Sequence, residues 1–163
     1  MNSPNPYAPP KSEVADVRQI NPAPRLWNPN AAANWSLLFS VIFGAVLHMK
    51  NWEALGEPEK AASSKRWAVG ALIFFVVMTV FSAFTEDEKL ADAITKIFAF
   101  GLLITWYFLN ARAQQRYVIA KFGQDYPRKG WLKPIGWAIL TIFGFIVVAG
   151  LVGGVIGHFS GEA

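Results

Sequence analysis

Long uninterrupted apolar runs, rather than apolar residues at amphipathic spacing, dominate this chain. Three of these runs are long enough to cross a membrane, at residues 67–84, 93–110 and 135–157. The first has 18 residues, which as a helix would be about 27 Å long and close to the thickness of a bilayer core. The pattern predicts an all-α integral membrane protein with three transmembrane helices. Tryptophans at or near the ends of these runs suit the membrane edges: Trp67, Trp106, Trp131 and Trp137.

A fourth apolar segment, at about 32–50, is shorter. Its unbroken part, WSLLFSVIFGAVL, has 13 residues, a length more typical of a re-entrant or interfacial segment than of a complete crossing. Gly44 stands where a re-entrant hairpin would need to bend. We therefore expect a short or re-entrant first membrane helix followed by the three spans.

The distribution of Lys and Arg predicts the orientation. The N-terminal tail carries three, the connector after the first segment four, the region of the acidic turn two, and the connector before the last helix six. If the first segment dips without crossing, 13 of these charges lie on one side and two on the other, as the positive-inside rule favours. The alternative has four spans with the N-terminus outside. Both arrangements place the basic connectors in the cytoplasm and the 85–92 turn and the C-terminus outside.

Residues 1–27 form a proline-rich tail that is expected to be extended or disordered, because proline lacks an amide hydrogen and restricts the residue before it. No signal peptide is visible in it. Residues 28–163 are predicted to form a single helical membrane domain. Asn28 is a favourable N-cap with Pro29 at the first helical position. Gly56 and Pro58 predict a stop and restart, and Gly123 a C-cap.

Composition narrows the possible functions. The chain has 163 residues, of which 53% are hydrophobic and 16% charged, a ratio too apolar for an ordinary soluble domain. Without cysteine, it has no disulfides and no thiolate chemistry. The net charge of +4 suits anionic lipid head groups, and nucleic acid is not an expected partner. The residues predicted to meet head groups are Arg112, Arg116, Lys121, Arg128, Lys129 and Lys133.

Few residues offer catalytic or metal-binding chemistry. His48 and His158 are predicted at opposite membrane interfaces, so they cannot share a site. An acidic cluster at 86–92 could bind a divalent cation, but a solvated turn is the favoured interpretation. Neither a nucleophile motif nor a phosphate-binding loop is present. The sequence therefore predicts a protein that is not an enzyme and holds no cofactor or metal.

The last helix carries small residues at four-residue spacing. Such spacing allows close helix packing in lipid, either within the monomer or in a homo-oligomer or complex with another membrane protein. We expect a scaffold or accessory subunit that acts through helix contacts. The alternatives are an immunity protein against a membrane-acting toxin and, less favoured, a subunit of a channel or transporter. The small residues are Ala149, Gly150, Gly153, Gly154 and Gly157.

Three stretches resemble small bacterial inner-membrane proteins of unknown function. They are NPYAPP at 5–10, LWNPNAAANWSLLF with LHMKNWEALGEPE at 26–59, and RYVIAKFGQDYPRKGWLKP at 116–134. The middle stretch is similar to a membrane-dipping segment of such families. The resemblance covers about half of the chain and implies a location in the bacterial inner membrane. It implies no activity and no catalytic residues.

Overall fold

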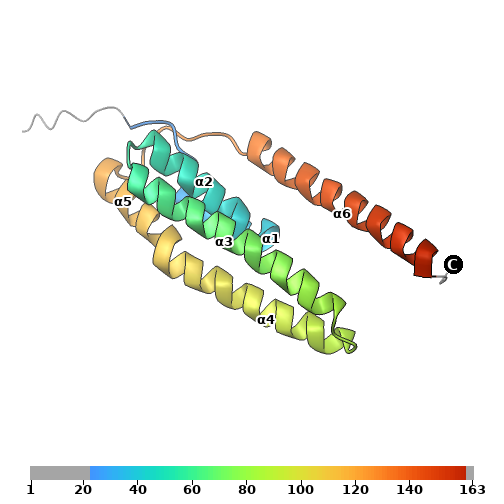
Figure 1. The fold of residues 1–163 in the computed structure, drawn as a ribbon. Coiled ribbons are helices and arrows are strands. Elements are labelled where there is room, and N and C mark those ends of the chain that lie inside the picture. The colour runs from blue at the N-terminus through green and yellow to red at the C-terminus, as the bar shows by residue number, and fades with distance from the viewer. Residues whose placement is uncertain (1–22, 161–163) are drawn as a thin grey trace, which may run out of the picture.

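The computed structural model describes residues 23–160. This part is all-helical apart from a single bridge between Leu26 and Arg128. The elements, in chain order, are α1 (Pro29–Phe39), α2 (Val41–Ala54), α3 (Pro58–Ala83), α4 (Glu88–Trp106), the π-helix η1 (Tyr107–Ala111), α5 (Arg112–Phe122) and α6 (Leu132–Ser160). Figure 1 shows α3 and α4 side by side, with α2 against the first half of α3; α1 packs against α2 and contacts η1 and α5.

The apolar segment predicted at 32–50 is a pair of antiparallel helices, α1 and α2. Ser40 separates α1 from α2 with a φ of 104°, so α2 runs back along α1. His48 Nε2 lies 3.2 Å from the carbonyl oxygen of Pro29, near the start of α1. The predicted bend at Gly44 is wrong, because Gly44 lies within α2 and faces α1. A Cβ atom at this position would come within 2.0 Å of Ser36 Oγ, so the glycine is needed for close approach of the two helices.

The predicted helix ends are confirmed where capping signals marked them. The Asn28 side chain accepts hydrogen bonds from the backbone N–H groups of Asn30 and Ala31, at 3.0 and 3.3 Å. Gly56 and Gly123 both have a φ of 73°, the left-handed conformation that ends α2 and α5.

Two helical stretches, Pro58–Ser82 and Glu88–Phe122, are long and apolar enough to cross a membrane. The second is continuous through η1 and begins earlier than predicted, because the Asp87 side chain caps it by accepting from Leu90 N–H at 3.0 Å. Large apolar side chains along α3, among them Val69, Leu72 and Val76, are exposed. In this respect α3 differs from the core helix of a soluble domain, whose apolar face would be buried.

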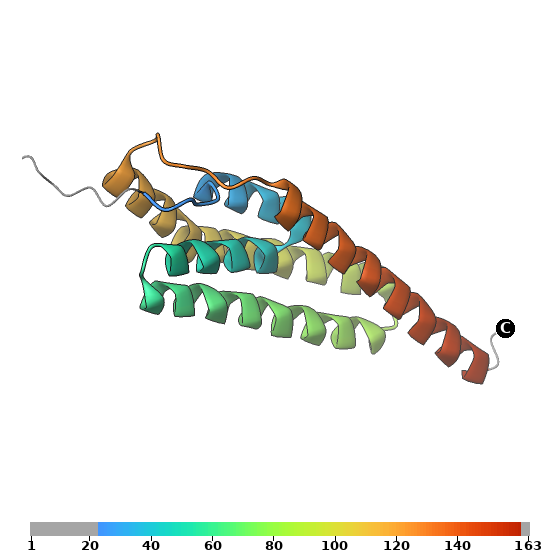
Figure 2. The same ribbon diagram turned by 90° about the horizontal axis from the view of Figure 1, so that it is seen from above.

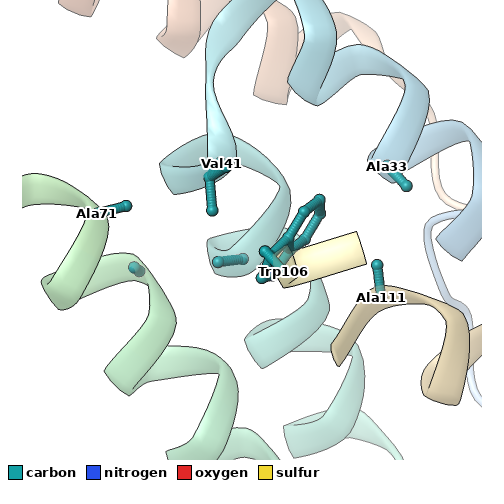
Figure 3. Packing of buried hydrophobic residues seen from close by; sticks show 7 residues of the cluster. Ala33, Val41, Ala71, Trp106 and Ala111 are labelled. Atoms are coloured by element: carbon teal, nitrogen blue, oxygen red, sulfur yellow. The ribbon is translucent and has the colours of Figure 1, made fainter. Parts of the chain in front are cut away.

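In the core, several alanine side chains surround the indole ring of Trp106. Trp106 is fully buried, and Figure 3 shows Ala33, Ala71 and Ala111 around it, from α1, α3 and η1. The prediction that Trp106 meets the membrane edge is therefore wrong. Alanines let the helix backbones approach closely, so that dispersion contacts with the indole hold several helices together.

The last helix lies apart from the others. Figure 1 shows α6 separate from α3 along its length, and Figure 2 shows it inclined to α3 and α4, with its C-terminal end beyond the ends of these helices. It begins at Leu132, slightly before the predicted start, because Pro134 falls in the first turn, where its missing N–H costs no helical hydrogen bond. Side chains such as Trp137, Leu140 and Phe143 are exposed.

The end of the predicted tail belongs to the folded part. Leu26 is fully buried, packs with Val118 and Tyr126, and exchanges backbone hydrogen bonds with the connector: its N–H donates to Pro127 O at 3.0 Å, and its carbonyl accepts from Lys129 N–H at 2.8 Å. The remaining tail prediction, for residues 1–22, lies outside the described residues.

Candidate functional site

A polar cluster joins the segment before α1 to α2 and α5. The Asn51 side chain accepts from Trp27 N–H at 3.0 Å and donates to Trp27 O at 2.8 Å. It also donates to Gln114 Oε1 at 3.1 Å, while Gln114 Nε2 donates to His48 O at 2.8 Å. Asn51 and Gln114 are both fully buried. Because an unpaired buried amide is costly, these bonds fix the position of the three segments relative to one another.

His48 lies in the interior rather than at an interface as predicted. Its side chain is fully buried, and its ring stands edge-on to Trp106 at a centroid distance of 5.4 Å. Within residues 23–160, His48 Nδ1 and Trp106 Nε1 have no hydrogen-bond partner. His48 thus helps to hold α2 to α1 through its contact with Pro29. His158 is in α6, and its side-chain surroundings are outside the described part.

A second polar contact is next to the π-helix. Ser64 Oγ donates to Asn110 Oδ1 at 3.0 Å, and both side chains are buried. Asn110 is in η1, where the wider helical turn interrupts the regular hydrogen-bond pattern. Such π-helical turns are frequent at functional sites. Here the turn places Asn110 toward α3, with Trp106 at the junction of α4 and η1 facing the alanine core.

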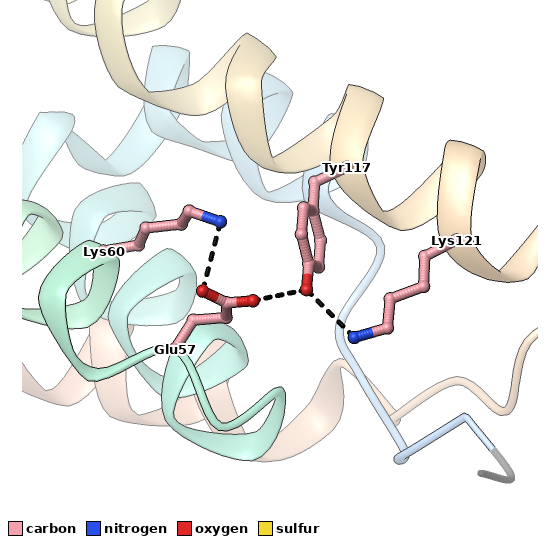
Figure 4. Close-up of polar contacts among 4 residues, drawn as sticks. All are labelled: Glu57, Lys60, Tyr117 and Lys121. Carbon is pink, nitrogen blue, oxygen red and sulfur yellow. Dashed lines mark hydrogen bonds and ion pairs between the residues drawn. The ribbon is translucent and has the colours of Figure 1, made fainter.

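A second polar cluster, with Glu57 and Tyr117 half-buried and Lys60 and Lys121 exposed, connects the α2–α3 turn to α5 (Figure 4). The Tyr117 hydroxyl donates to Glu57 Oε1, Lys60 Nζ pairs with Glu57 Oε2 at 3.1 Å, and Lys121 Nζ donates to the Tyr117 oxygen at 3.0 Å. The hydrogen bond from Tyr117, followed by that from Lys60, holds the pKa of Glu57 below its ordinary value. Lys60 also lies over the rings of Trp52 and Tyr117.

The residues predicted to meet lipid head groups are spread over two elements and a connector. Arg112, Arg116 and Lys121 are on α5, and Lys133 is in the first turn of α6. Arg128 and Lys129 are in the connector between these helices, and only Lys129 in this set is half-buried. Lys129 Nζ lies 4.3 Å from the centroid of the Trp27 ring. Desolvation lowers the pKa of Lys129, and the nearby charges of Lys50 and Arg25 lower it further.

The predicted helix-packing positions, Ala149, Gly150, Gly153, Gly154 and Gly157, all fall within α6. The backbone there is continuous helix, so the four-residue spacing does place them along one side. What surrounds them lies outside the described residues, and their role stays a prediction.

Sequence reasoning missed the buried polar residues. Asn51, Gln114 and Asn110 were not selected, because single amides in a helix carry no motif. The local sequence offered little signal, because Asn51 stands between Lys50 and Trp52 at the polar end of α2, where an amide is as readily exposed as buried. The buried amides fix the segment before α1, α2 and α5 relative to one another. Among the residues described, this cluster contains no nucleophile next to a base.

No family model matches this chain, and no curated protein and no solved structure is similar to it. The resemblance to small bacterial inner-membrane proteins therefore stays a prediction.

Proposed function

We propose that this protein is a small, non-enzymatic inner-membrane protein that acts through helix contacts, as a scaffold or accessory subunit of a membrane assembly. The observation that supports this most is the position of α6. This helix is the most apolar segment, and it lies apart from and inclined to a bundle that is held together by buried side chains (Figure 2). A helix that its own chain covers so little is available to a second membrane helix.

The proposed membrane placement follows from helix lengths. α1 and α2 have 11 and 14 residues, or about 16 and 21 Å, and each is shorter than a bilayer core of about 30 Å. Their antiparallel arrangement suits a segment that enters and leaves on one side. In this proposal α3, the α4–α5 stretch and α6 cross the membrane. The basic connectors are cytoplasmic, and the 85–92 turn and the C-terminus are periplasmic.

The outward face of α6 suits association. Ile139, Phe143 and Ile146 on this face are exposed, and the helical repeat continues it from Phe143 to Gly150, seven residues further on, and then to Gly154. Lipid tails solvate large apolar side chains well, so those alone require no partner. Glycines at four-residue spacing favour another helix instead, because close backbone approach gains packing that lipid does not provide.

The proposal is tested by changing this face only. Replacing Gly150 and Gly154 with Leu should shift the detergent-solubilised protein to a smaller assembly, measured by size-exclusion chromatography with light scattering and by crosslinking in native membranes. Gly144→Leu is the matched control, since Gly144 lies on a different side of α6 with no atom within 4 Å of a Cβ placed there. If the double variant keeps both the size and the crosslinked partners of the unmodified chain, association through this face is excluded.

A further inference from the structure

An apolar groove runs between the α1–α2 pair and α6. Its volume is about 540 Å³, within the range of roughly 300–1,000 Å³ that is common for small-molecule pockets. Along α2 it extends from Lys50 back to the turn at Ser40, and along α6 from Lys133 to Ile142. The side chains between these ends are almost all apolar; they include Phe39, Phe43, Val46, Leu47, Trp137 and Ala138.

Basic groups gather around one wall of the groove. Lys50 and Lys133 line it together with Trp27. Lys129 lies over the Trp27 ring, and the Trp27 indole N–H donates to Gly130 O at 3.0 Å, so the basic connector is fixed to this wall. Within residues 23–160, none of these lysines forms an ion pair with a carboxylate; the pairs found there are Lys60–Glu57 and Lys96–Asp92.

The positive charges of Lys129, Lys50 and Arg25 are close enough to repel one another. Lys129 is partly desolvated and is close enough to Lys50 and Arg25 for their charges to lower its pKa. Like charges held together in a partly desolvated place favour an anion, because a bound negative charge would relieve their repulsion. The groove beside them presents a mostly apolar lining, and a hydrocarbon chain placed there would remove this apolar surface from water.

We propose that the groove binds an anionic phospholipid, with the phosphate at Lys50, Lys129 and Lys133 and an acyl chain along α2 and α6. A phospholipid unites the two properties that the site presents, a negative phosphate and a long apolar chain. Bound there, the lipid would fill the space between α6 and the bundle. The inference rests on the membrane placement proposed above, and it is independent of association through the outward face of α6.

Native mass spectrometry of the detergent-solubilised full-length chain tests the site. We compare phosphatidylglycerol with phosphatidylcholine of the same acyl chains, and expect phosphatidylglycerol to bind at least tenfold more tightly. The double variant Lys50→Gln/Lys133→Gln should lose about tenfold or more in affinity for phosphatidylglycerol, since each lysine near an anionic lipid contributes about fivefold. Equal binding of the two lipids by the unmodified chain would overturn the proposal.

Two pairs of variants distinguish binding in the groove from a general attraction of the basic protein surface for anionic lipid. Lys65→Gln/Arg66→Gln removes the same charge from exposed positions on α3 that do not line the groove, and it should keep the affinity for phosphatidylglycerol. Ala138→Phe should obstruct the groove and weaken the binding of both lipids, whereas Ile139→Phe, on the exposed side of α6, should not. An equal loss in both charge variants, or unchanged binding by Ala138→Phe, would contradict the proposal.

A competition experiment identifies the source of the phosphate. Millimolar inorganic phosphate should leave bound phosphatidylglycerol in place, because free phosphate lacks the chain that fills the groove. Displacement by phosphate alone would overturn the lipid assignment. The Gly150→Leu/Gly154→Leu variant should retain lipid binding, so a failure of the association proposal and a failure of this one give different results.

Discussion

Gly44 provides the space in which Trp106 is buried: a Cβ atom at Gly44 would lie 2.4 Å from the Cη2 atom of the indole. This contact joins α2 to the junction of α4 and η1. The same Cβ would also lie 2.0 Å from Ser36 Oγ of α1. The missing side chain of Gly44 thus allows α1, α2 and the indole ring to pack closely. The alanines around Trp106 make up the rest of its surroundings.

We expect Gly44→Ala to destabilise the fold by about 1–3 kcal/mol, the usual cost of overpacking a core. The clash outweighs the gain of roughly 1 kcal/mol that alanine brings to a helix interior. Thermal unfolding in detergent, followed by circular dichroism, measures the difference. Gly70→Ala is the control, because nothing lies within 4 Å of a Cβ at Gly70, and it should be neutral or stabilising. A Gly44→Ala protein as stable as the Gly70→Ala protein would contradict the packing described.

Ser40 carries backbone strain at the turn of the helix pair. Its φ of 104° and ψ of 164° lie in a region that is populated almost only by glycine, at a cost of about 1–3 kcal/mol for other residues. We expect Ser40→Gly to stabilise the protein by about 1 kcal/mol after the greater freedom of glycine in the unfolded chain is subtracted. The same unfolding measurement should show the opposite sign for Ala62→Gly, in the helical interior of α3. Destabilisation by Ser40→Gly would argue against this turn.

Local signals predicted the three helix ends at Asn28, Gly56 and Gly123, whereas tertiary contacts decided how the helices pack. Asn28, Gly56 and Gly123 act through their own backbone and side chains, so the sequence sufficed for them. The bend was assigned to Gly44 because glycine favours turns, yet Gly44 is used for close packing, and the turn falls on Ser40. The reason lies in Trp106, whose burial against α2 depends on residues far away in the chain.

The polar cluster of Trp27, Asn51 and Gln114 could not be predicted from the sequence either. Asn51 and Gln114 are 63 positions apart, and nothing in either local sequence indicates the other. Small-residue packing that the sequence did not predict is present around Trp106, in Ala33, Ala71 and Ala111, while the packing predicted for α6 stays a prediction. Isolated alanines on separate helices form no sequence motif. They surround the Trp106 side chain only after the helices have packed together.

The cluster of Glu57, Lys60, Tyr117 and Lys121 predicts a pH dependence. A carboxyl group whose pKa is lowered on folding stabilises the fold above its ordinary value near 4.5, and that contribution is lost as the pH falls through the lowered pKa. The melting temperature should therefore decrease on acidification below about pH 4.5, and it should decrease less in Glu57→Gln and in Tyr117→Phe.

Melting curves between about pH 3 and pH 7 measure this dependence in detergent. Glu59→Gln is the control, since it removes a carboxylate of the same type that is exposed two residues further on, outside the contact with Tyr117. A Glu57→Gln profile that coincides with that of the unmodified chain would show that this cluster does not hold the turn to α5.

The antiparallel α1–α2 pair predicts that the N-terminal tail and the start of α3 are on the same side of the membrane. The absence of cysteine permits single-cysteine labelling of intact spheroplasts with an impermeant maleimide. Ser64 is a poor probe because it is buried against Asn110, so the exposed Ala62 is the better position. Ser3→Cys and Ala62→Cys should be protected, and Glu86→Cys and Ser160→Cys labelled. Labelling at both 3 and 86 with protection at 62 would mean that residues 32–50 cross the membrane, because the tail could not otherwise be outside while α3 begins inside.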